Sequence, residues 1–192
     1  MAAAVQSTVT GVWDGTTTVT FTGLAASAGN AVTVQMNARD NVGAAFSSAT
    51  WNGGSVTPSE VVADAVVNGI QLITLSFTGL TGTHTLVVVL DSNMDDMAGW
   101  AHVISNADTS NVLGAAGYSA ADNFDSPAAA PAASNADSRV LSQIRGRSDY
   151  TASMAVQAGQ TGLAGPTLTG NGNTVMCSRE AGAASVTSGY RF

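Results

Sequence analysis

Several stretches in the N-terminal half of the chain place an apolar residue at every second position. The pattern runs through Val32–Met36 and Ile73–Phe77, and Val19 and Phe21 continue it with Thr17 on the same face. A period of two is the signature of a strand with one buried face. The sequence therefore predicts three amphipathic strands. Leu86–Leu90 is apolar at every position, which predicts a central strand covered on both sides.

Two turns are indicated between these strands. Asn68-Gly69 lies between the apolar runs Ala65–Val67 and Ile70–Leu72. Because both residue types tolerate positive φ, this is the strongest short-range hairpin signal. Asn52-Gly53-Gly54 follows Phe46–Trp51 and has similar turn chemistry. The segment after Pro58 has one weak helical feature, a possible cap, but its β-branched residues favour strand.

A Phe-Thr-Gly-Leu corner occurs twice, at Phe21–Leu24 and at Phe77–Leu80, and each copy lies between two strand patterns. Glycine permits a sharp bend, and the leucine after it can return to the core. Such a corner passes a chain from one sheet to another, which predicts a β-sandwich.

Small and polar residues dominate from Asn106 to Asp137, and strand patterns then resume to the end of the chain. These strands are expected at Arg139–Arg145, Tyr150–Gln157, Asn173–Ser178 and Ala184–Phe192. The predicted fold is all-β, a single jelly-roll-like β-sandwich over residues 1–192 with a loop or arm insertion at about 106–137. The alternatives are an immunoglobulin-like sandwich, or two small immunoglobulin-like halves that divide near residue 100.

Composition narrows the function classes. Charged residues make up 10% of the chain, all six basic residues are Arg, and the net charge is -7, which argues against nucleic-acid binding. No apolar run approaches the ~20 residues of a membrane-spanning helix. The first residues lack the pattern of a secretory signal, so we expect synthesis in the cytoplasm. One cysteine, Cys177, cannot form a disulfide within the chain.

Candidate chemistry is sparse. His84 and His102 are the only imidazoles, and no Gly-x-Ser-x-Gly motif, zinc-ligand spacing or nucleotide-binding fingerprint accompanies them. A nucleophile needs a base beside it, and neither histidine is in such a setting. We therefore predict no catalytic residues, no cofactor and no enzymatic activity.

The densest acidic segment follows the predicted central strand. Asp91, Asn93 and Asp95 alternate in the manner of calcium ligands. However, Asp96 occupies the position where a calcium loop has glycine, and His102 the position where it has glutamate. These departures favour a solvated loop, and the three residues are only weak calcium candidates, so no metal site is predicted.

Partner-binding residues are expected in the C-terminal half. Residues 1–100 hold seven acidic residues and one Arg, whereas positive charge gathers later in the chain. A basic patch there fits an acidic partner surface, including that of a neighbouring copy. The proline- and alanine-rich arm offers a second contact. The candidates are Asp125, Pro127, Pro131, Arg139, Arg145 and Arg147.

Three strings carry a resemblance to a known group: Phe46–Gly54, Leu80–Val89 and Ala101–Asp108. In that order they resemble β-sandwich structural proteins of tailed bacteriophages and prophages, in which a strand ending in aromatic-x-Gly precedes a Gly-Thr-His-Thr corner. The match covers about half the chain. The corner is also similar to those of immunoglobulin-like and fibronectin-like domains.

The resemblance implies a virion component and carries over no functional residue. The expected function is that of a capsid decoration or cement protein, which binds the major capsid protein and its own copies, with a trimer as one possible homo-oligomer. Neither nucleic acid nor a membrane is an expected partner, and the expected location is the virion. The alternative is a tail or fibre module that binds a host receptor or carbohydrate through Trp13, Trp51 or Trp100.

Overall fold

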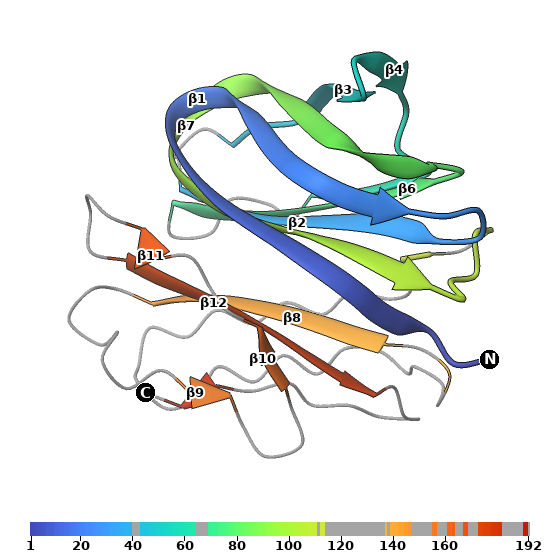
Figure 1. Ribbon diagram of the computed structural model, residues 1–192. Coiled ribbons are helices and arrows are strands. Elements are labelled where there is room, and N and C mark those ends of the chain that lie inside the picture. Colours follow the sequence, from blue (N-terminus) through green and yellow to red (C-terminus); the bar gives the residue numbers. More distant parts are fainter. Residues whose placement is uncertain are drawn as a thin grey trace. The chain divides into compact units, whose positions relative to one another are not determined.

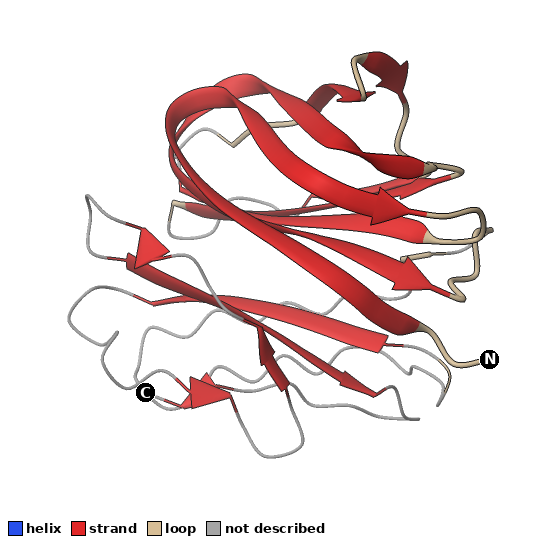
Figure 2. Cartoon of the chain, viewed as in Figure 1, coloured by secondary structure: helices blue, strands red, loops and turns tan. Residues whose placement is uncertain are grey.

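The computed structural model describes residues 1–39, 43–63, 69–110, 112–113, 137, 139–146, 155–156, 161–163, 167–168, 173–181 and 190–191. These residues form strands and connections, with no helix among them (Figure 2). The predicted all-β class is confirmed. The chain divides into two compact units: the N-terminal unit, Ala4–Val112, and the C-terminal unit, Met1–Ala3 with Leu113–Phe192.

The N-terminal unit is an antiparallel sheet. Its strands are β1 (Ala4–Ala26), β2 (Ala31–Arg39), β3 (Phe46–Trp51), β4 (Gly54–Val56), β5 (Glu60–Ala63), β6 (Ile70–Thr78) and β7 (Gly82–Ser105). Their order is β4-β3-β7-β2-β6-β5, and β1 pairs with β7. The long strand β7 organises the sheet, because its first half pairs with β3, its second half with β2, and both halves with β1.

This sheet curls over on itself where β1 and β7 bend together (Figure 1). Thr16 on β1 faces Met94 on β7, yet Thr18 faces Val89. Two residues of β1 thus advance beside five residues of β7, so the longer strand takes the outer path of the bend. Gly15, with φ of 56°, permits the turn in β1. An irregularity of this kind increases local twist and bends the sheet.

The hydrophobic core lies inside the curl. Residues from both halves of the sheet form one buried cluster, which includes Val19, Phe21, Leu24, Val34, Met36, Ile73, Leu75, Phe77, Leu86, Val88 and Met94. Trp13 packs edge-on against Phe21, with ring centroids 5.1 Å apart. A sheet that folds over its own apolar face buries a core without a second, separate sheet.

Burial corrects two details of the predicted strands. The alternation in β2 predicted one solvated face, but all residues from Ala31 to Ala38 are buried, including Thr33, Gln35 and Asn37. In contrast, Leu86–Leu90 was predicted to be covered on both sides. Leu86, Val88 and Leu90 are buried while Val87 and Val89 are half-exposed, so this part of β7 is covered on one face only.

One predicted turn is confirmed, and so are the bend and the buried leucine of the two Phe-Thr-Gly-Leu corners. The prediction that these corners pass the chain from one sheet to another is wrong, because Phe21–Leu24 lies within β1 and Phe77–Leu80 runs from β6 toward β7 of the same sheet. Gly23 and Gly79 both have φ of 75°, and the leucines that follow, Leu24 and Leu80, are buried. Asn52 and Gly53 form a two-residue turn between β3 and β4, both with positive φ. β5 and β6 pair antiparallel, and Gly69 has φ of 73°. The rest of that predicted hairpin, Ala65–Asn68, lies outside the described residues.

In the C-terminal unit, the described strands are β8 (Arg139–Gly146), β9 (Ala155–Val156), β10 (Thr161–Leu163), β11 (Thr167–Leu168), β12 (Asn173–Ala181) and β13 (Tyr190–Arg191). Strand β12 pairs antiparallel with β8, β10 and β11, and β13 pairs with β9. Strands predicted at Arg139–Arg145 and Asn173–Ser178 are confirmed. The predicted single domain and the sandwich topology stay predictions, as does most of the arm, which lies outside the described residues.

Candidate functional site

The acidic segment Asp91–Asp96 belongs to β7, and the predicted loop is therefore wrong. Asp91 lies at the bend and is fixed to the preceding connection. Its carboxylate Oδ1 accepts a hydrogen bond from the Ala45 N–H at 2.7 Å, and its own N–H donates to the Ala45 carbonyl at 3.0 Å. The Ser92 hydroxyl donates to the Gly43 carbonyl at 2.9 Å. The start of this acidic segment thus anchors the connection between β2 and β3 to the bend of β7.

The other two calcium candidates, Asn93 and Asp95, are exposed on β7. Within the described ranges, no group of three or more His, Cys, Asp or Glu side chains is arranged to hold a metal ion. The calcium hypothesis therefore gains no supporting geometry, and it stays a prediction that ligand binding alone can test.

Among the partner-binding candidates, Asp125, Pro127, Pro131 and Arg147 lie outside the described residues. Arg139 and Arg145 are on β8, opposite Ala181 and Val175 of β12. They are six residues apart on one strand, or about 20 Å, so they occupy its two ends and form no compact cluster. Sequence reasoning missed Arg179, which is opposite Leu141 at a register position of the same parity. Arg179 lies directly after the predicted strand Asn173–Ser178. Only the strand register shows that it is beside β8.

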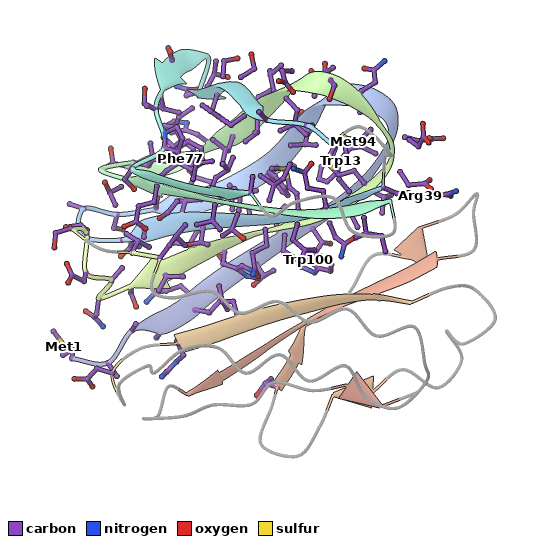
Figure 3. The ribbon with its side chains drawn as sticks, turned by 180° about the vertical axis from the view of Figure 1, so that it is seen from behind. Met1, Trp13, Arg39, Phe77, Met94 and Trp100 are labelled. Carbon is purple, nitrogen blue, oxygen red and sulfur yellow. The ribbon has the colours of Figure 1, made fainter. Side chains whose placement is uncertain are left out.

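A row of polar residues crosses five strands of the N-terminal unit. Strand register places Glu60 opposite Ser76, Ser76 opposite Thr33, Thr33 opposite His102, and His102 opposite Thr8. We call these residues the polar row. Directly opposed residues in a sheet share a face, so the row lies on one face. Trp100, two residues before His102 on β7, is on the same side of the sheet as the polar row. Phe77 and Met94 are on the other side (Figure 3).

The middle of the polar row is fully buried. Ser76 and His102 are 0% exposed and Thr33 is 2% exposed. His102 Nδ1 lies 3.0 Å from Thr8 Oγ1, and Glu60 Oε1 accepts a hydrogen bond from the Val112 N–H at 3.1 Å. The hydroxyls of Thr33 and Ser76 have no hydrogen-bond partner within the described part of the chain.

The polar row has the residue types of a hydrolase but not the geometry. Ser76 and His102 are separated by the strand that carries Thr33, which is about 9–10 Å between backbones. A nucleophile and its base must be within hydrogen-bond reach. Thr8 meets that distance to His102, but the imidazole is buried, and substrate has no access to it. The contact between Thr8 and His102 instead joins the neighbouring strands β1 and β7.

Charge is paired at the far end of the same face. Arg39 of β2 is opposite Asp96 of β7, and Arg39 Nη1 lies 3.4 Å from Asp96 Oδ2. The Asp96 side chain is 5% exposed and that of Arg39 is 45% exposed. A carboxylate that is nearly buried needs such a cation, and the arginine reaches solvent beyond it.

A second cluster forms where β3 meets the start of β7. Trp51 Nε1 donates a hydrogen bond to the Thr81 carbonyl at 3.0 Å, and the Asn52 N–H donates to the Thr85 carbonyl at 3.1 Å. The Trp51 ring stands perpendicular to the His84 ring, with centroids 5.5 Å apart. His84 is therefore part of a structural contact. We call these residues the Trp51–His84 cluster.

The class that these observations define is an all-β protein built on a curled antiparallel sheet. Comparison with protein-family models, with curated proteins and with solved structures found no match for this chain. In the described residues, no helix is long and apolar enough to cross a membrane.

Proposed function

We propose that this chain is a structural protein of a tailed-phage virion, a capsid decoration or cement protein. It is made in the host cytoplasm and resides in the virion, where it binds the shell of the major capsid protein and further copies of itself. Its role is mechanical and non-enzymatic. Many weak interfaces, repeated over a symmetric shell, together give strong attachment and resist internal pressure.

The observation that carries this proposal is the Trp51–His84 cluster. The strings Phe46–Gly54 and Leu80–Val89 resemble phage structural proteins, and this cluster joins them through two hydrogen bonds and one ring contact. The third string, Ala101–Asp108, begins within the same strand, β7. The resemblance thus falls on one connected part of the sheet, which supports a shared fold with that group.

The chemistry of the described residues also supports a structural role. The two histidines, the strongest candidates for a catalytic base, take part in packing. His84 contacts Trp51, and His102 is buried beside Thr8. A surface of strands and short turns offers partners its edges and faces.

The alternative function, a tail or fibre module that binds sugars, depends on tryptophan rings that are open to stack on a ligand. Trp100 is 0% exposed and Trp51 is 9% exposed, with its indole N–H bonded to Thr81. Trp13 packs on Phe21 and is partly buried. These positions do not favour the alternative.

The proposal is tested by quantifying this chain by mass spectrometry in purified virions of the phage that encodes it. The amount is compared with that of the major capsid protein before and after tails are removed. Retention on tailless heads in a copy number comparable with the shell protein supports decoration. Loss with the tail, or absence from the virion, contradicts it.

A further inference from the structure

Among its described residues, the N-terminal unit has three strands at the edges of its sheet: β4, β5 and β1. Two of these edges carry features that limit pairing with another chain. Strand β4 has three residues and is followed by Pro58, and β5 has four residues and begins at Glu60. Short length, charge and proline are the common protections of an exposed sheet edge.

Strand β1 lacks these protections. In the described part of the chain it pairs with β7 alone, and Ser7–Asp14 runs in unbroken register from Val103 to Asp96. This segment holds no proline, and Asp14 is its single charged residue. We call Ser7–Asp14 the β1 edge. An unprotected edge of this length presents a row of backbone donors and acceptors to another strand.

Burial shows that the β1 edge is open. Trp100 and Ala98 of β7 are 0% exposed. Their direct partners on β1, Thr10 and Val12, are exposed. Val12 is one of three large hydrophobic residues exposed among those described, at 43%. The burial of this face therefore ends before β1.

Charge limits where two copies of this chain can meet. The N-terminal unit has one Arg against eight acidic residues, a formal charge of -7, whereas the C-terminal unit has five of each and a charge of zero. Two copies that approach through their N-terminal units repel each other over most of that surface. The β1 edge contributes little to this repulsion, because Asp14 is its single charged residue and is at one end of the segment.

We propose that the β1 edge pairs antiparallel with the β1 edge of a second copy, which makes a two-fold symmetric dimer with a continuous sheet. Pairing centred on Gly11 places Val9 opposite Trp13 and Thr10 opposite Val12 of the other copy. Each Asp14 then faces a Thr8 hydroxyl and not a second carboxylate, so the only charge of the segment is accommodated. Such an isologous interface is the commonest form of homo-oligomer.

This inference rests on the proposed function in one respect, since that function includes binding between copies. The β1–β1 interface would be the contact that joins neighbouring copies of this chain on the capsid shell. It is tested in solution, without particles, so that it can fail while the virion proposal stands.

The experiment is sedimentation velocity on the full chain over a range of protein concentrations. We expect a monomer–dimer equilibrium. The Val12→Lys variant places two ammonium groups beside the two-fold axis, and we expect its dimer to dissociate at least ~10-fold more readily. Val61→Lys is the matched control, because Val61 is a valine on the β5 edge with 47% exposure. That variant should dimerise as the wild type does.

Circular dichroism and thermal melting establish that both variants fold. If Val12→Lys does not fold, Thr10→Glu at the neighbouring exposed position gives the same test with negative charge. A wild-type chain that stays monomeric at every concentration overturns the proposal. So does a Val61→Lys variant that weakens the dimer as much as Val12→Lys. A monomer that is nevertheless abundant in virions overturns the β1 dimer alone.

Discussion

Thr8 Oγ1 and His102 Nδ1 lie 3.0 Å apart, across a strand pair that joins residues 94 positions apart in the sequence. The contact occurs at a site where the imidazole is fully buried. It also marks the register of β1 on β7, because a slip of one residue in β1 would turn Thr8 to the other face of the sheet.

Replacing Thr8 with Val removes the hydroxyl partner of His102 while keeping the shape of the side chain. A buried polar group that loses its partner costs about 1–3 kcal/mol, and we expect Thr8→Val to lower the free energy of unfolding by that amount in urea denaturation. Thr20→Val is the control, because Thr20 is exposed on the same strand and outside the β1 edge, and surface changes cost about 0.5 kcal/mol or less. Equal losses in the two variants would contradict a specific role for the contact.

The turn between β3 and β4 depends on backbone conformation at one glycine. Gly53 has φ of 78°, where a side chain costs about 1–2 kcal/mol. Gly53→Ala should therefore lower the melting temperature. Gly54 is outside the left-handed region, and a Cβ there would lie 3.5 Å from the Trp51 carbonyl, an ordinary contact. Gly54→Ala should leave stability nearly unchanged, and a larger loss in it than in Gly53→Ala would show that the turn is not formed.

Asp91 and Asp95 are both exposed acids of β7. The Asp91 carboxylate is fixed at the bend, where it accepts a hydrogen bond from the Ala45 N–H at 2.7 Å. Asp91→Ala should cost about 0.5–1.5 kcal/mol, and Asp95→Ala less than about 0.5 kcal/mol, in chemical denaturation. The same proteins allow a calcium test. A melting temperature that rises with calcium in the wild type, and in neither variant, would establish the calcium site instead.

Deletion of residues 122–135 tests the predicted arm, which contains Asp125, Pro127 and Pro131. We expect the shortened chain to keep its circular dichroism spectrum and to bind capsid shells more weakly, because the arm would contribute contacts and not core. Binding is measured by co-sedimentation of the chain with purified heads. A deletion of equal length within residues 1–100 would remove core strands, so the intact chain is the reference. Shell binding equal to that of the intact chain would rule out the arm as a contact.

Local pattern predicted much of the fold. The period of two at Val32–Met36 and Ile73–Phe77 identified β2 and β6, and the turn and corner residues at Asn52, Gly23 and Gly79 adopt the positive φ that their residue types favour. Those features depend on a few consecutive residues. The acidic segment from Asp91 was interpreted as a loop because its polarity is high, but pairing with β1 and β2 continues β7 through and beyond it.

The sequence by itself determined the all-β class, the positions of the core strands and the chemistry of the turns, since each follows from residue type and spacing. Only the tertiary structure decided which polar positions are buried. Ser76 and Thr33 each lie in an alternating strand, where alternation alone predicts solvent, and His102 lies among the apolar residues Trp100 to Ile104. Their assembly into the polar row, and the open β1 edge beside it, depend on strand order and register. These are set by packing between segments up to about a hundred residues apart, which no local period records.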